Sequence, residues 1–321
     1  MTCKIKFSMA VRPEDNDEEL RFARQLDVPC VYTWVRPEQR TYDFLARLRE
    51  SVEAAGLMLY MVGSMDVGKS DKIHLGLPGR DEKIDQFQAF VRHLGRVGIP
   101  YTTFTWEPDQ VWSSPSSVTR GDAVTRHVDL NEMKRRPFTH ARAYSPEEIW
   151  ANFEYFVRRM MPVCEAAEVR LALHPNDPPT DELGGIPCLI QNRESYDRAF
   201  AIANSPYLGM EFCVGCWLEG GQAFGNVLDG IRHFHEMGKI FIVHFRNITA
   251  PLPVFDETFL DNGYMDMYQV MKTFCEVGYA GTMTLDHTPK FVGDFAKGGG
   301  PAYAIGYMRA LKERAEAELG G

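Results

Sequence analysis

The chain has 321 residues, of which 45% are apolar, 25% charged and 12% aromatic, a composition typical of a globular protein with a sizeable core. Its formal net charge of −9 at pH 7 excludes the basic surface that nucleic acids and anionic membranes require, but not a small anionic substrate. No apolar run approaches the roughly 18 residues that are needed to cross a bilayer.

Eight short β-rich segments recur along the whole chain. Several are continuously apolar and too short for helices, such as Phe241-Ile242-Val243, which is typical of parallel strands that are covered on both faces. The predicted strands are Ile5–Ala10, Pro29–Trp34, Leu57–Val62, Tyr101–Trp106, Val169–His174, Leu208–Val214, Ile240–Phe245 and Thr282–Asp286.

Helical segments with apolar residues at three- and four-residue spacings lie between these strands. The clearest start is Ser145-Pro146-Glu147-Glu148, which combines an N-cap, a proline at the first helical position and a capping-box glutamate. The predicted helices are Glu18–Gln25, Tyr42–Ala55, Asp81–Val97, Pro146–Glu168, Arg193–Asn204, Phe224–Met237, Met265–Val277 and Ala302–Ala317.

The eightfold strand–helix alternation predicts a parallel sheet, either closed or doubly wound. A doubly wound sheet usually has a Gly-rich loop after its first strand, whereas this strand continues into Val11-Arg12-Pro13-Glu14. We therefore predict an α/β fold, a single (β/α)8 TIM barrel domain over residues 1–321. The long connection at about 107–144 is rich in Ser, Pro, Arg and Asp, and we interpret it as an active-site loop insertion.

Metal-binding residue types stand at the ends of four consecutive predicted strands: His174, Cys213, His244 and Asp286. Singly, a histidine at a strand end is more often a hydrogen-bonded scaffold residue, and Cys213 alone would be an ordinary buried thiol. Because the active site of such a barrel is built where its strands end, their convergence predicts one divalent metal. The donor types suit Zn²⁺, Fe²⁺ or Co²⁺, and a hydroxy-acid substrate suits Mn²⁺ or Mg²⁺, so the metal stays open.

Two further residues beside these strand ends are candidates for the chemistry. His287 follows Asp286 and is a candidate proton carrier near neutral pH, or alternatively a residue that orients Asp286. Arg246, two residues after His244, is a candidate to hold a substrate carboxylate, or alternatively a surface ion-pair partner.

Four tryptophans fall near strand ends or in mouth loops, where an aromatic ring can pack against a sugar. They are Trp34, Trp106, Trp112 and Trp217. Ordinary core or loop packing is the commoner role for each ring. Trp217 directly follows Cys216 and is the first that we would mutate.

Several of these segments resemble the mannonate dehydratase family of the xylose-isomerase-like barrels. The similarity is strongest in the second half of the chain, and weaker echoes occur around Lys72-Ile73-His74 and Trp112. The matching segments are Leu173-His174-Pro175-Asn176-Asp177-Pro178-Pro179, Phe212-Cys213-Val214-Gly215, Val243-His244-Phe245-Arg246-Asn247, Met265-Asp266-Met267-Tyr268, and Gly278-Tyr279 leading into Asp286-His287.

The resemblance implies a lyase that removes water from D-mannonate and forms 2-keto-3-deoxygluconate. It assigns the metal, usually Mn²⁺, to the four strand-end residues, with Fe²⁺, Co²⁺ or Zn²⁺ as alternatives. It also assigns acid and base catalysis to His287 and a catalytic role to Tyr303, which lies one position away from the family's tyrosine. The implied substrate contacts are Arg246, His74, Trp112 and Asn176.

The chain departs from the family where substrate contacts are expected. Thr284-Leu285-Asp286-His287-Thr288 replaces the family's Arg-Pro-Asp-His-Gly, so a cation is missing, and Phe259-Leu260-Asp261-Asn262-Gly263 replaces His-Leu-x-Gly-Asp. An alternative function is therefore a metal-dependent isomerase, epimerase or related lyase acting on a neutral or modified sugar, with Glu107 and Glu211 as extra carboxylates. A third is a sugar-binding barrel without activity.

The sequence also gives expectations for location and partners. The seven cysteines are an odd number without framework spacing, and the first residues lack the apolar core of a signal peptide. We therefore expect a reduced, cytoplasmic protein that binds a small sugar or sugar acid, interacts with neither nucleic acid nor membrane, and forms a homo-oligomer, a dimer or higher.

Overall fold

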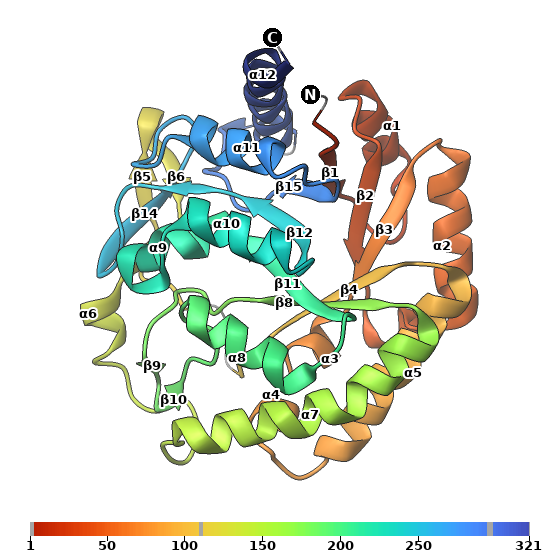
Figure 1. The fold of residues 1–321 in the computed structure, drawn as a ribbon, viewed down its shortest axis with the longest axis vertical. Helices are drawn as coiled ribbons and strands as arrows, with labels where there is room; N and C mark the ends of the chain where they lie inside the picture. The colour runs from red at the N-terminus through yellow and green to blue at the C-terminus, as the bar shows by residue number, and fades with distance from the viewer. Residues whose placement is uncertain (1–2, 109–111, 294–297, 321) are drawn as a thin grey trace.

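Eight parallel strands close into a barrel, which confirms the predicted fold (Figure 1). The computed structural model describes residues 3–108, 112–293 and 298–320. The order around the barrel is β1-β15-β12-β11-β8-β4-β3-β2. In chain order the barrel strands are β1 (Lys6–Ala10), β2 (Cys30–Trp34), β3 (Met58–Gly63), β4 (Tyr101–Thr105), β8 (Arg170–His174), β11 (Leu208–Cys213), β12 (Ile240–Phe245) and β15 (Thr282–Leu285).

Helices surround this barrel and cover the outer faces of its strands (Figure 1). The capping box predicted for α7 is present: Ser145 Oγ accepts a hydrogen bond from the Glu148 amide, and the Glu148 carboxylate accepts one from the Ser145 amide. The helices are α1 (Asp17–Gln25), α2 (Tyr42–Ala54), α3 (Met65–Gly68), α4 (Asp71–His74), α5 (Arg80–Val97), α6 (Leu130–Met133), α7 (Pro146–Ala167), α8 (Arg193–Ala203), α9 (Val214–Phe224), α10 (Val227–Glu236), α11 (Met267–Glu276) and α12 (Gly299–Gly320), with 3₁₀ turns at Pro37–Gln39 and Arg120–Asp122.

One long helix was not predicted. The pattern over Phe224–Met237 corresponds to α10, but α9 begins directly after β11 and carries the side chains of Cys216 and Glu219 toward Asp177. Its three glycines lower the helix propensity of this segment, so the segment does not resemble a helix in sequence. Tertiary packing, with Trp217 stacked on Phe212, overrides that propensity.

The connection after β4 forms strands of its own. β5 (Ser117–Thr119) and β6 (Ala123–Thr125) pair as an antiparallel hairpin, and β7 (His127–Asp129) pairs with β14 (Val254–Thr258). β14 also pairs with β13 (Asn247–Ile248), directly after β12, and a short pair is formed by β9 (Glu182–Leu183) and β10 (Ile186–Pro187). The connection thus reaches the loop after β12, as the left side of Figure 1 shows; residues 109–111 lie outside the described ranges.

The cysteines differ from the expected set of reduced thiols. Cys3 and Cys275 form a disulfide with a Cα–Cα distance of 5.0 Å across 272 residues of sequence. Closure of the barrel brings Cys3 beside α11 and α12, a contact that spacing alone does not reveal. None of the helices among residues 3–108, 112–293 and 298–320 is long and apolar enough to span a membrane.

Candidate metal centre and catalytic mouth

The four predicted metal ligands lie on four neighbouring strands at one end of the barrel. His174 is the last residue of β8, Cys213 is the last residue of β11, and His244 on β12 is paired in register with Cys213. Asp286 follows the last residue of β15. Because all strands of the barrel are parallel, these four side chains meet at its carboxyl-terminal mouth.

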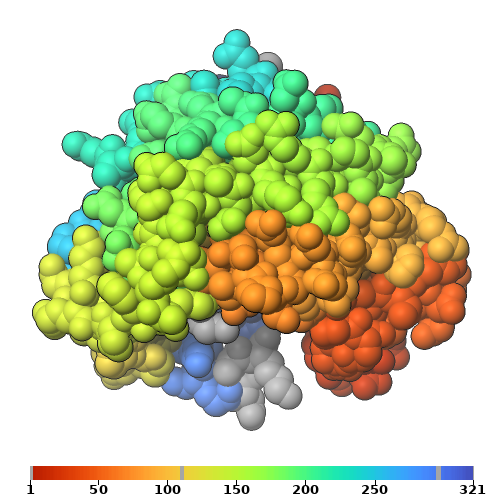
Figure 2. Space-filling model, turned by 90° about the horizontal axis from the view of Figure 1, so that it is seen from below, coloured from red at the N-terminus to blue at the C-terminus, as the bar shows by residue number. Residues whose placement is uncertain are grey.

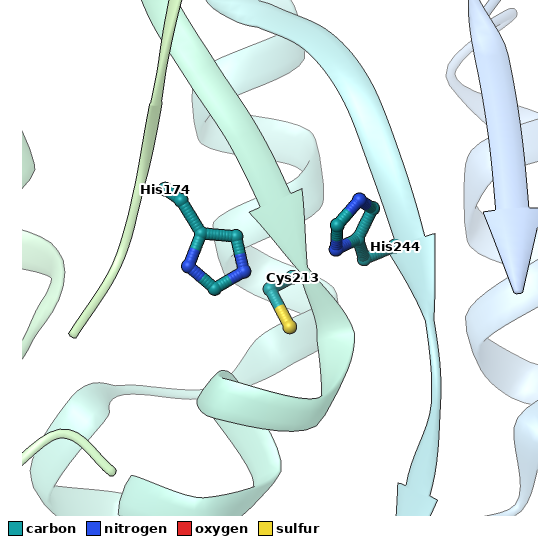
Figure 3. Close-up of side chains that lie close together, drawn as sticks. All are labelled: His174, Cys213 and His244. Atoms are coloured by element: carbon teal, nitrogen blue, oxygen red, sulfur yellow. The ribbon is translucent and has the colours of Figure 1, made fainter. Parts of the chain in front are cut away.

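The donor atoms of three of these residues converge closely. One atom each from His174, Cys213 and His244 lies within 4.8 Å of the others, and Figure 3 shows the two imidazole rings on either side of the cysteine. Asp286 joins them, since its Oδ1 lies 3.3 Å from His244 Nδ1 and its Oδ2 lies 3.5 Å from Cys213 Sγ. The buried His244 Nδ1 makes no hydrogen bond among the described residues, as expected of an atom that binds a metal.

Neighbouring groups select the nitrogen that each histidine offers. His174 Nδ1 lies 2.7 Å from the Pro175 carbonyl, to which it donates, so its Nε2 is left for the cluster. His244 Nε2 lies 2.7 Å from Glu211 Oε1, which leaves Nδ1 for the cluster. Glu211 is itself held by Thr103, whose hydroxyl donates to Oε2 at 2.5 Å. A carboxylate behind a ligating histidine fixes its tautomer and ring orientation.

The charges in the cluster fit a thiolate between imidazoles. Burial raises the pKa of the Cys213 thiol, but the hydrogen bond from Cys216 and the nearby Arg246 charge outweigh burial and hold this pKa well below its usual range. Burial lowers the pKa of His174, but the hydrogen bond with Cys213 and the charge of Cys213 raise it to about 9. The two imidazoles, thiolate and carboxylate are a donor set that suits a divalent transition metal.

Arg246 lies beneath the mouth, a position that differs from the prediction that it holds a substrate carboxylate. Its guanidinium is fully buried and contacts four carboxylates. Asp177 lies at 3.2 Å, Glu219 at 2.9 Å and Asp286 at 3.0 Å, and Glu257 is also in contact. Because these carboxylates surround it, Arg246 positions acidic side chains and does not line the mouth cavity.

Arg126 is a second buried cation that the sequence did not indicate. It comes from the connection after β4, and its Nη1 lies 2.8 Å from Asp177, 3.1 Å from Glu257 and 3.6 Å from Glu219. Two further groups have metal-binding geometry, Asp177 with Cys216 and Glu219, and Asp177 with Glu257 and His287. Their carboxylates are all paired with the two arginines, whereas neither His174 nor His244 is paired with an arginine among the described residues.

The mouth encloses a cavity of about 270 Å³ that is lined by His174, His244 and Asp286. His287 also lines the cavity, with Nδ1 2.8 Å from Glu257 Oε1 and Nε2 3.5 Å from Asp286 Oδ1. The charge of Asp286 raises the pKa of His287, burial lowers it, and the charge of Glu257 raises it further, so that the net shift is upward. His287 therefore lies at the edge of the candidate metal site, a position that is compatible with proton transfer.

None of the four predicted substrate contacts, Arg246, His74, Trp112 and Asn176, is among the described residues that line this cavity. His74 is buried and packs against Trp106 with a ring-centroid distance of 4.4 Å, and its pKa is lowered to about 3, mainly by burial. Asn176 is also buried, and its side chain donates to the Trp106 carbonyl and accepts from the Ile190 amide. Both side chains hold loops in place around the mouth.

The remaining aromatic candidates are divided between the site and the core. Trp34 lines the mouth cavity, and Trp112 lines a small pocket beside it that shares Glu107 and Asp177 with the cavity. Trp106 and Trp217 are buried in the core.

Tyr303 lies on α12, where its hydroxyl donates to Asp261 Oδ1 at 2.5 Å. Arg120 forms an ion pair with the same Asp261 carboxylate at 2.8 Å. Tyr303 is not among the described residues that line the mouth cavity.

The closed barrel and its carboxyl-terminal mouth define a xylose-isomerase-like TIM barrel. A xylose isomerase domain protein from Planctomyces limnophilus has this fold, with a TM-score of 0.67, 15% identity, and coverage of 99% of this chain and 100% of that one. The crystal structure of mannonate dehydratase from Streptococcus suis serotype 2 matches with a TM-score of 0.84 at 24% identity, covering 98% and 96% of the two chains.

Sequence comparison narrows this class to one family. The family model of D-mannonate dehydratase (UxuA) matches residues 36–124 and 123–316. The mannonate dehydratase of Thermotoga maritima is 30% identical, over 89% of this chain and 85% of that protein. The chain belongs to the D-mannonate dehydratase family and is a hydro-lyase, which confirms the resemblance.

Proposed function

We propose that this protein dehydrates D-mannonate to 2-keto-3-deoxygluconate and water with Mn²⁺ bound by His174, Cys213, His244 and Asp286. The observation that carries the proposal is the convergence of these four side chains on one cavity, with His287 beside them. The relatives named mannonate dehydratase support the choice of substrate. Fe²⁺, Co²⁺ and Zn²⁺ are compatible with the same donors.

When bound, the metal supplies Lewis acidity that stabilises negative charge on substrate oxygens. The protein's own contribution is the proton transfer. His287 Nδ1 donates a hydrogen bond to Glu257 Oε1, so Nε2 is the nitrogen that exchanges a proton with the substrate. In the proposed reaction the C2–H bond and the C3–O bond break, the departing hydroxyl takes up a proton, and the resulting enol becomes the 2-keto acid. Glu257 and Asp286 hold the imidazole in place while its charge changes.

The test combines metal analysis with product analysis. Wild type, His174→Ala and His287→Ala are assayed with D-mannonate and Mn²⁺ for the 2-keto-3-deoxy acid, and His233→Ala is a control because His233 pairs with Asp197 on the outer helices. We expect both site variants to lose turnover and only His174→Ala to lose metal. Full metal occupancy without turnover of D-mannonate would contradict the substrate, and absence of metal binding would contradict the site.

A second function is an isomerase or epimerase reaction on a neutral sugar. One observation favours it: no arginine is found among the described residues that line the mouth cavity, whereas Glu107 and Glu211 both line it. A substrate without a carboxylate does not need an arginine. Incubating the manganese-loaded protein with ketohexoses and following epimer formation by chromatography distinguishes this function from dehydration.

A further inference from the structure

We propose that Lys69 and Glu107 form a subsite for the hydroxyl groups at the far end of the sugar acid, whose carboxylate end lies at the metal cluster. This inference rests on the proposed function. Lys69 is the one lysine or arginine among the described residues that line the cavity. Its Nζ donates to Glu107 Oε2 at 2.9 Å, and both side chains are largely buried, with 12% and 9% of their area exposed.

Lys69 lies across the mouth from His244, whereas Glu107 follows β4, which is next to β8, the strand that carries His174. Lys69 follows β3 and α3, and β3 is four strands from β12, which carries His244, in either direction around the closed barrel. Gly68 determines this placement, because a Cβ atom there would lie only 2.9 Å from the Thr103 carbonyl oxygen of β4. In Figure 2 the orange surface of this region lies between the red surface of the amino-terminal part and the yellow-green surface of α7.

The Glu107 carboxylate is held by hydrogen bonds to both of its oxygens, whereas the Lys69 ammonium has donors left over. Glu107 Oε1 accepts a hydrogen bond from the Asp177 amide at 2.5 Å, so both carboxylate oxygens have a partner. An ammonium group carries three N–H donors, and Lys69 has one hydrogen-bond partner within the described part of the chain. Two donors therefore remain for a molecule in the cavity.

The charges of this pair favour hydroxyl groups over a second anion. Lys69 and Glu107 neutralise each other, so a carboxylate or phosphate placed there gains little attraction and is repelled by Glu107. A hydroxyl group can accept from the ammonium and donate to the carboxylate at once. Trp34 and Met65 also line this side of the cavity and offer apolar surface to the C–H groups of a sugar chain.

The experiment compares substrates that differ only in the length of the polyol tail. D-mannonate is compared with a four-carbon acid of the same configuration at C2 and C3, which is too short to reach the pair. We expect Lys69→Met to lower kcat/KM for D-mannonate about 10- to 100-fold and to leave that for the four-carbon acid nearly unchanged. Lys72→Met, an exposed lysine on α4, is the matched control and should change neither value.

Glu107→Gln tests the charge argument separately, because its amide oxygen can still accept from the Asp177 amide. It leaves the Lys69 ammonium unneutralised, so we expect a six-carbon acid with carboxylates at both ends to gain affinity relative to D-mannonate.

Two outcomes of the Lys69→Met experiment would contradict the proposal. An equal loss of kcat/KM for D-mannonate and for the four-carbon acid would place Lys69 at the reacting end of the substrate. No loss for either acid would show that the pair does not bind substrate.

Calorimetric titration of both acids into the manganese-loaded protein distinguishes failure of the subsite from failure of the proposed function. If D-mannonate binds the wild type more tightly than the four-carbon acid does, and Lys69→Met loses this difference, the subsite is supported even when the wild type dehydrates neither acid. Equal binding of the two acids to the wild type would overturn the subsite, whatever the turnover.

Discussion

The two halves of the barrel mouth hold their polar side chains in different ways. On the metal half, formed by β8, β11, β12 and β15, each of the four candidate ligands is backed by a buried partner such as Glu211 or Arg246. On the opposite half, formed by β1 to β4, the described residues that line the cavity form one ion pair, that of Lys69 with Glu107. The buried partners preorganise the metal half, whereas we expect substitutions in the opposite half to alter the choice of substrate.

The largest expected effect comes from removing the cation beneath the metal half. Arg246→Met leaves the carboxylates of Asp177, Glu219 and Asp286 buried without this partner, and we expect it to lower the free energy of unfolding by about 3–5 kcal/mol. The control is Arg232→Met, whose exposed pair with Asp229 is worth less than about 1 kcal/mol. Urea titrations of both variants check this, and equal stability of the two would show that the network is not essential.

A smaller effect is expected behind His244. Glu211→Gln removes the negative charge that orients the His244 ring, and we expect the Kd for Mn²⁺ to rise about 10- to 100-fold. Glu107→Gln is the matched control, because it removes a carboxylate from the other half of the same cavity and should leave the Kd for Mn²⁺ unchanged. A similar rise in both variants would mean that the whole mouth, and not its metal half, determines metal affinity.

The pKa values of the cluster predict how metal binding depends on pH. His174 has a pKa raised to about 9 without metal, so below that pH it carries a proton that must leave before Nε2 can bind a metal. The pKa of His244 is also raised, since the attraction of Glu211 outweighs burial. The apparent association constant should therefore rise with pH, by at least about tenfold per unit between about pH 6 and 8, and rise less steeply above pH 9, where His174 no longer carries its proton.

Calorimetry in buffers of different ionisation enthalpy counts the released protons. We expect between one and two protons per Mn²⁺, from His174 and His244, because the thiol of Cys213 is already ionised. Binding without proton release would contradict the assignment of these histidines as ligands.

The sequence predicted the strands and the metal half because both follow from periodic, local patterns. A parallel strand is a short apolar run, and its last residue lies at the mouth, so His174 and Cys213 could be placed without three-dimensional information. Arg246 was predicted in the mouth because residues two apart on a strand share a face with His244. It does point inward, but carboxylates from three other segments cover it.

The residues that sequence reasoning missed depend on contacts between distant segments. Arg126 reaches Asp177 and Glu257 only because β7 pairs with β14, and no local pattern around Arg126 indicates that pairing. Lys69 lies in a short irregular segment whose position depends on a single close approach of Gly68 to β4. Such residues differ from strand ends because their place in the site is set by packing and not by periodicity.

The smallest expected effect concerns the aromatic wall of the opposite half. Trp34 lines the cavity, and its ring is packed so closely on Gly63 that a Cβ atom there would lie 2.4 Å from it. Trp34→Leu keeps an apolar side chain but removes the flat ring, so we expect KM for D-mannonate to rise about three- to tenfold with kcat nearly unchanged.

Trp112→Leu is the matched control, because Trp112 lines the neighbouring pocket and not the mouth cavity. Steady-state kinetics on both variants separate KM from kcat. A fall in kcat as large as the rise in KM in Trp34→Leu would mean that the ring aligns the reacting carbons. The division between a chemical half and a substrate-binding half of the mouth would then not hold. A rise in KM alone would sharpen that division, since it locates on β2 a contact that is made equally in the ground state and the transition state.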